Sequence, residues 1–60
     1  MELKLGDIVK VRFVERVGAK MREIWRPAQI IQLAGERFGV RFQDDKQMLL
    51  EKQRYGELWR

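Results

Sequence analysis

The sequence predicts an all-β fold, a small and strongly bent barrel of five strands. Three short runs carry this prediction, at residues 6–13, 25–31 and 39–45. Each run has the composition of a strand with one buried face and is bounded by turn residues. The runs nearly fill a chain of 60 residues, which is enough for one domain, so we expect a single barrel over residues 1–60.

The first strand is predicted directly after a Gly-Asp turn. Val9, Val11 and Phe13 share one face of it, so they are expected in the core, while basic residues face water. Residues 15–24 have no regular period, and Gly18 argues against a helix there. We therefore expect a long loop between strands one and two, and loops of this length are often functional.

The second strand is predicted to begin at Pro27, where a missing N–H costs least. Ala28 and Ile30 lie on one face, whereas Ile31 begins a pair of apolar residues on the other. This switch predicts a β-bulge or a sharp bend. The third strand contributes three alternating apolar residues, namely Phe38, Val40 and Phe42.

A polar turn at residues 43–46 follows, in which aspartate side chains are expected to accept hydrogen bonds from nearby backbone N–H groups. The fourth strand is predicted at Gln47–Glu51, a short 3₁₀ turn near Gln53–Tyr55, and the fifth strand at Glu57–Arg60. A C-terminal helix is the alternative for this last segment, although Gly56 argues against it.

The composition excludes several kinds of chemistry. The chain contains no Cys, His, Ser or Thr, so it has no Ser or Cys nucleophile and no thiolate or imidazole metal ligand. Asp44 and Asp45 are adjacent in a turn, which is a poor arrangement for a metal or acid–base pair. We therefore expect no enzyme, no metal site and no cofactor. No run is long and apolar enough to span a membrane and no signal peptide is visible, so a cytoplasmic protein is expected.

Positive charge is concentrated in one part of the chain. The net charge is +4, and residues 10–26 alone hold six bases against two acids, whereas the rest balances seven bases with seven acids. A localised basic patch indicates a polyanionic partner such as nucleic acid. The predicted patch consists of Lys10, Arg12, Arg16, Lys20, Arg22, Arg26 and Arg41.

Aromatic residues near the patch are candidates for stacking on bases. Trp25 is the main candidate, although a tryptophan that covers the open end of a barrel fits the sequence equally well. Tyr55 lies between Arg54 and Gly56 and is a weaker candidate, expected to be partly exposed. Trp59 is predicted to belong to the core.

Three short motifs resemble those of the Tudor-type branch of SH3-like barrels, over roughly residues 6–58. They are Gly6-Asp7-x-Val9-x-Val11, Trp25-x-Pro27-Ala28-x-Ile30 and Val40-x-Phe42-x-Asp44-Asp45. The C-terminal domains of retroviral integrases have a similar outline, and in that family the barrel binds DNA. This second resemblance implies the same kind of partner as the basic patch.

The Tudor resemblance implies a different function, the capture of a methylated lysine or arginine in an aromatic cage. Phe13, Phe42 and Asp44 match positions of such a cage. Two other cage positions depart from the pattern, because Arg26 and Met48 stand where aromatic residues are expected. A guanidinium at the cage would repel a methylammonium ligand.

Nucleic-acid binding is the favoured function, with little sequence preference and with DNA and RNA both open. The alternatives are a protein-interaction barrel, which docks a peptide or forms a homodimer through a strand edge, and the methyl-mark reader. A chain of this length that begins at Met1 is expected to be a free small protein.

Overall fold

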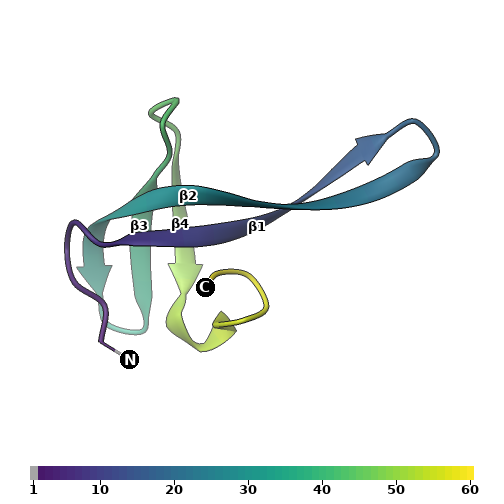
Figure 1. Cartoon of the computed structure of the whole chain (residues 1–60). Helices are drawn as coiled ribbons and strands as arrows, with labels where there is room; N and C mark the ends of the chain where they lie inside the picture. Colours follow the sequence, from purple (N-terminus) through teal and green to yellow (C-terminus); the bar gives the residue numbers. More distant parts are fainter. Residues whose placement is uncertain (1) are drawn as a thin grey trace.

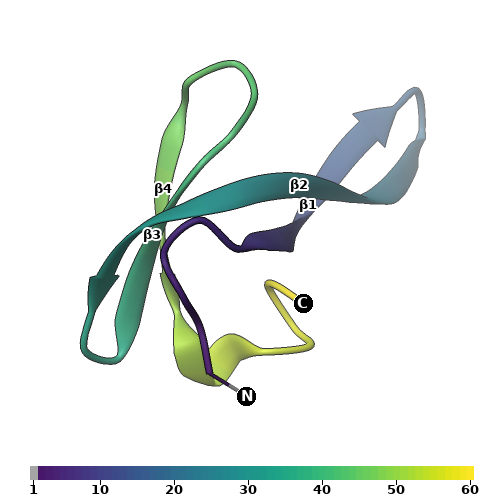
Figure 2. The ribbon, with the colours of Figure 1, turned by 60° about the vertical axis from the view of Figure 1, so that its left-hand side comes forward.

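A computed structural model describes residues 2–60, and Met1 lies outside the described residues. Four antiparallel strands form one sheet in the order β1-β2-β3-β4, and the sheet curls into a half-barrel (Figures 1 and 2). The all-β prediction is confirmed. The elements are β1 (Ile8–Val17), β2 (Lys20–Ala34), β3 (Arg37–Arg41), β4 (Gln47–Glu51) and the 3₁₀ helix η1 (Lys52–Arg54).

The core lies on the concave face of the sheet, and alternation predicted most of it. Its buried members are Val9, Val11, Ala28, Ile30, Phe38, Val40, Phe42, Leu50 and Trp59. The register between β2 and β3 shifts between Ile30 and Gln32, so the predicted bulge is confirmed. Trp59 is 3% exposed and its indole Nε1 donates to the Glu51 carbonyl oxygen at 3.0 Å. The prediction that Trp59 belongs to the core is therefore confirmed.

The predicted loop at residues 15–24 is wrong. β1 and β2 pair without interruption from Ile8–Gln29 to Val17–Lys20, and they form a two-stranded ribbon that extends beyond the other strands (Figure 1). Every residue from 14 to 23 is exposed. Because both faces of this part of the ribbon are exposed to water, neither needs to be apolar. The alternation of apolar and polar residues that indicates a half-buried strand is therefore missing.

Pro27 lies in the middle of β2 and not at its beginning, which corrects the predicted start of this strand. Its partner on β1 is Lys10, whose N–H donates to the Arg60 carbonyl at 2.7 Å and whose carbonyl accepts from the Arg60 N–H at 2.8 Å. Both backbone groups of Lys10 therefore point away from β2. Lys10 and Pro27 thus form a non-hydrogen-bonded pair of the antiparallel ladder. A proline at such a position removes no hydrogen bond of the β1–β2 ladder. On the other side of β2, Pro27 lies beyond the pairing with β3, which ends at Arg41 opposite Gln29.

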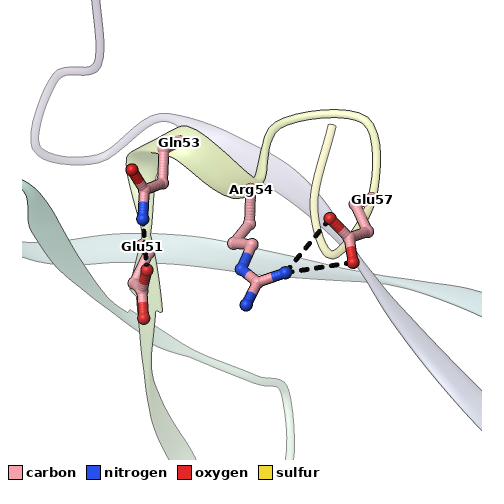
Figure 3. Close-up of polar contacts among 4 residues, drawn as sticks. All are labelled: Glu51, Gln53, Arg54 and Glu57. Atoms are coloured by element: carbon pink, nitrogen blue, oxygen red, sulfur yellow. Dashed lines mark hydrogen bonds and ion pairs between the residues drawn. The ribbon is translucent and has the colours of Figure 1, made fainter.

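The segment after β4 turns back to β1. The 3₁₀ helix begins one residue earlier than predicted, and no longer helix forms in the described chain. Figure 3 shows its side-chain contacts: Gln53 donates to Glu51 at 2.8 Å, and Arg54 donates to both carboxylate oxygens of Glu57 at 3.1 and 3.2 Å. Gly56 has a φ of +85°, a left-handed conformation that prevents the alternative C-terminal helix from continuing.

The predicted fifth strand at Glu57–Arg60 is reduced to isolated bridges. Trp59 bridges Val11 in antiparallel fashion, and Leu58 accepts a backbone bond from Arg12 at 2.8 Å. The chain has just left a tight turn, in which the N–H groups of Glu57 and Leu58 donate to the Arg54 carbonyl at 3.1 and 2.9 Å. This turn leaves too few extended residues for a regular strand, so the sheet formed by residues 2–60 has four strands.

The turn at the tip of the ribbon depends on Gly18, whose φ is +64° while that of Ala19 is not positive. This combination identifies a type II′ hairpin turn, which requires glycine at its first central position. We expect Gly18→Val to destabilise the ribbon by about 1–2 kcal/mol, because a side chain is strained there. Amide hydrogen exchange should rise in the ribbon and not in β3 or β4. Ala19→Ser is the control, and an equal effect of both changes would contradict this account.

Candidate functional site

The ribbon carries the predicted basic residues on two different faces. Successive side chains of a strand point to opposite faces, and Val11 marks the face that continues the core. Three of the predicted cations lie on the outer face, namely Lys10, Arg12 and Arg16. Three lie on the core-side face, namely Lys20, Arg22 and Arg26. Arg41 is on β3, opposite Gln29 and on the outer face. The cations therefore surround the ribbon and do not form one flat patch.

Trp25 lies on the outer face opposite Arg12 and is half-buried. Its indole Nε1 donates to Glu23 Oε1 at 2.6 Å, and Arg12 Nε donates to Glu23 Oε2 at 2.9 Å. The guanidinium carbon of Arg60 is 4.0 Å from the centre of the indole ring, a close cation–π contact. We call these four residues the Trp25 cluster. It holds the ring in place at the root of the ribbon.

Glu23 and Arg60 were missed by the sequence reasoning. Glu23 falls in the segment expected to be a loop, so nothing placed it beside Trp25. Arg60 reaches the ring only because the C-terminal residues pair with the edge of β1. An Arg at the end of the chain gives no sequence signal for that contact.

The pKa of Glu23 is lowered, first by the hydrogen bond from Arg12, then by the one from Trp25 and by the charges of Arg12 and Arg60, while burial acts the other way. The ionised cluster is thus favoured near neutral pH, and this contribution is lost as the pH falls through the lowered pKa of Glu23. We expect the Trp25 indole N–H signal to shift at a pH below the usual range for glutamate. Glu23→Gln should abolish that transition, and its persistence would show that another group causes it.

Phe13, Phe42 and Asp44, the predicted partial cage, line one hollow of about 200 Å³ together with Arg26 and Met48. The two phenylalanine rings meet edge to face, with their centres 5.4 Å apart. The guanidinium carbon of Arg26 lies 5.6 and 5.7 Å from the two ring centres. The ring faces that a methylated cation would need are therefore already in contact with the protein's own cation.

Most of the predicted cations are free to meet an external anion. Within residues 2–60 three ion pairs form, Arg12–Glu23 at 2.9 Å, Arg22–Glu15 at 3.7 Å and Arg54–Glu57 at 3.1 Å. Exposed pairs of this kind are weak. In this part of the chain the predicted cations outside any ion pair are Lys10, Arg16, Lys20, Arg26 and Arg41.

Tyr55 follows η1 and lies outside the ribbon. It is 54% exposed, as predicted, and its ring meets that of Trp59 at 4.9 Å between centres. It lines a different hollow, with Leu3 and Leu33. Tyr55 is thus exposed, and its aromatic contact is with Trp59 of the core.

The aspartate turn has a structural role in the described structure. Asp44 Oδ1 accepts a hydrogen bond from the Lys46 N–H at 3.1 Å, which confirms the prediction for this turn. Asp45 has a φ of +68° and donates its N–H to the Phe42 carbonyl at 3.0 Å.

Among residues 2–60 there is no group of three His, Cys, Asp or Glu side chains arranged to hold a metal ion. None of the helical structure in these residues has the length and apolar character needed to cross a membrane.

Comparisons with protein-family models, with curated proteins and with solved structures gave no significant match. The features of this chain that bear on its function are therefore the ribbon, its cations and the Trp25 cluster.

Proposed function

We propose that this chain is a non-catalytic binding module that binds nucleic acid through the β1–β2 ribbon. The observation that carries the proposal is a projecting two-stranded ribbon whose exposed cations are mostly outside ion pairs. Cationic side chains on a projecting element can follow phosphates without a preformed pocket. The proposed interface consists of Lys10, Arg12, Arg16, Lys20, Arg22, Trp25, Arg26 and Arg41, with Arg60 added by its contact with Trp25.

The charge at this interface favours weak binding with little sequence preference. Phosphate contacts position a protein on nucleic acid but carry no sequence information. Of the ribbon cations, Arg12 and Arg22 are partly neutralised by Glu23 and Glu15. About four or five phosphate contacts remain, and they give a log–log salt slope of about −4.

We also propose that the half-barrel is a five-stranded SH3-like barrel of the Tudor-like type, with residues 57–60 as a reduced fifth strand. The supporting observation is the pair of backbone bonds between Lys10 and Arg60, at 2.7 and 2.8 Å, beside the Val11–Trp59 bridge. These contacts bring the end of the chain to the free edge of β1. They close part of the gap that a four-stranded sheet leaves.

The test of the proposed function is a fluorescence anisotropy titration with short labelled duplex DNA, single-stranded DNA and duplex RNA. We expect binding at about 50 mM salt that weakens by roughly a hundred-fold or more at about 200 mM. Different sequences of one nucleic-acid type should bind alike. No binding to any of the three at low salt would refute the proposal.

A protein-interaction module is the second candidate, supported by apolar side chains on the outer face near the sheet edge. Leu49 of β4 is 60% exposed, and Ile31 lies near it across Gly39. β4 is an edge strand of the sheet, and an apolar edge can pair with another chain. This candidate predicts self-association or peptide binding that is insensitive to salt, measured by sedimentation at low and high ionic strength.

A further inference from the structure

The outer part of the ribbon is free on both sides. β3 pairs with β2 only from Gln29 onward, and the C-terminal residues reach β1 only as far as Arg12. Beyond these points the described strands pair with each other alone, down to Val17–Lys20 at the tip. The Cα trace measures 39 Å along its longest axis and only 14 Å along its shortest, and the ribbon projects at one end (Figure 2).

Cations lie on both faces of this free part. Arg16 is on the outer face opposite Met21, whereas Lys20 and Arg22 are on the core-side face. A flat basic surface would meet phosphates on one side only. Cations on both faces can all meet phosphates when the ribbon lies between two phosphate-lined walls, and a duplex groove offers such walls.

The widths and depths of the duplex grooves favour the major groove of B-DNA. The major groove of B-DNA, about 12 Å wide and about 8.5 Å deep, admits a two-stranded β-ribbon. At about 3.3 Å per residue, that depth holds two or three cross-strand pairs. The minor groove, about 6 Å wide, is too narrow, and the major groove of duplex RNA is deep and narrow.

We propose, on the premise that the chain binds nucleic acid, that the tip of the ribbon (residues 15–22) enters the major groove of duplex DNA tip first. Arg16 and Lys20 then face opposite phosphate walls. Glu15 is held by Arg22 at 3.7 Å, which limits its repulsion of the phosphates. The Gly18-Ala19 turn then meets the groove floor, while the exposed side chains of Val17 and Met21 lie on the same faces as Lys20 and Arg16.

The test compares a shortened ribbon with a charge-matched full-length one. The first variant lacks Arg16, Val17, Lys20 and Met21, so Glu15 and Arg22 flank the same Gly-Ala turn. Removing two residues from each strand preserves the pairing and the faces. The control is Arg16→Gln with Lys20→Gln, and both proteins have a net charge of +2, which is +4 less two bases. Amide spectra of β3 and β4 must match in all samples, which shows that the core is folded.

We expect the shortened protein to bind duplex DNA about ten-fold or more weakly than its charge-matched control, the scale of losing groove contacts. On single-stranded DNA the two should bind alike. Duplex DNA whose major groove is filled by glucosylated cytosines should bind the wild type poorly, and a minor-groove drug should not compete.

Equal affinity of the two variants for duplex DNA would overturn the inference, as would competition by the minor-groove drug. If the wild type binds duplex DNA, single-stranded DNA and duplex RNA equally, this inference fails while the proposed function stands. If it binds none of them, both fail.

Discussion

Trp59→Ala is expected to remove a large part of the protein's free energy of unfolding. The side chain is 3% exposed, its ring meets Phe38 at 5.0 Å between centres, and its Nε1 bonds to the Glu51 carbonyl. Replacing a buried tryptophan with alanine costs about 3–5 kcal/mol. A domain of 60 residues has a total stability of about 3–9 kcal/mol, from roughly 0.05–0.15 kcal/mol per residue.

The buried ring also anchors the C-terminal residues, whose backbone bridges Val11 at Trp59, so its loss is expected to loosen that bridge as well. Urea denaturation followed by circular dichroism measures the effect. Tyr55→Ala is the matched control, since it removes an exposed ring from the same turn and should cost about 1 kcal/mol, the scale of an aromatic pair. A Trp59→Ala protein that loses no more stability than Tyr55→Ala would show that the C-terminal segment is not part of the core.

Arg16→Gln with Lys20→Gln is expected to weaken duplex DNA binding by about 10- to 100-fold near 100 mM salt and to reduce the salt slope by about 2. Both side chains are on the free part of the ribbon and outside the three ion pairs of residues 2–60. Arg26 is left unchanged, because its guanidinium packs on two phenylalanine rings and its loss would disturb the fold.

The control for this variant is Lys4→Gln with Lys52→Gln, which gives the same net charge of +2 from positions outside the ribbon. Its affinity should stay within about three-fold of the wild type, because exposed charges beyond about 10 Å are largely screened at this salt. If both double variants lose affinity equally, net charge alone drives the binding and the ribbon has no special role.

The core was predictable because one face of each strand is buried. Alternation along Phe38, Val40 and Phe42 is a direct consequence of that burial, and the structure buries all three. The outer ribbon could not be predicted in the same way. Both of its faces are exposed to water, so polar and apolar side chains are tolerated on either face and no alternation marks the strands. Its only local signal was Gly18, which sequence reasoning used against a helix but not as a hairpin turn.

The candidate site was predictable in residue type and not in arrangement. The cations from Lys10 to Arg26 were singled out by charge alone, and charge says nothing about which face a side chain occupies. The contacts of Trp25 depend on a cross-strand register and on the return of the C-terminus. The register follows from the Gly18-Ala19 turn once that turn is recognised, whereas the return of the C-terminal residues is a long-range pairing that no local pattern encodes.

The most direct test of nucleic-acid binding by the ribbon is an amide-shift NMR titration of the labelled protein with a short DNA duplex, at low and at moderate salt. We predict shifts concentrated on residues 12–25 and on the indole N–H of Trp25, which fade as salt rises. Shifts confined to β4 and the Leu49 side of the sheet, or no shifts at low salt, would contradict the account.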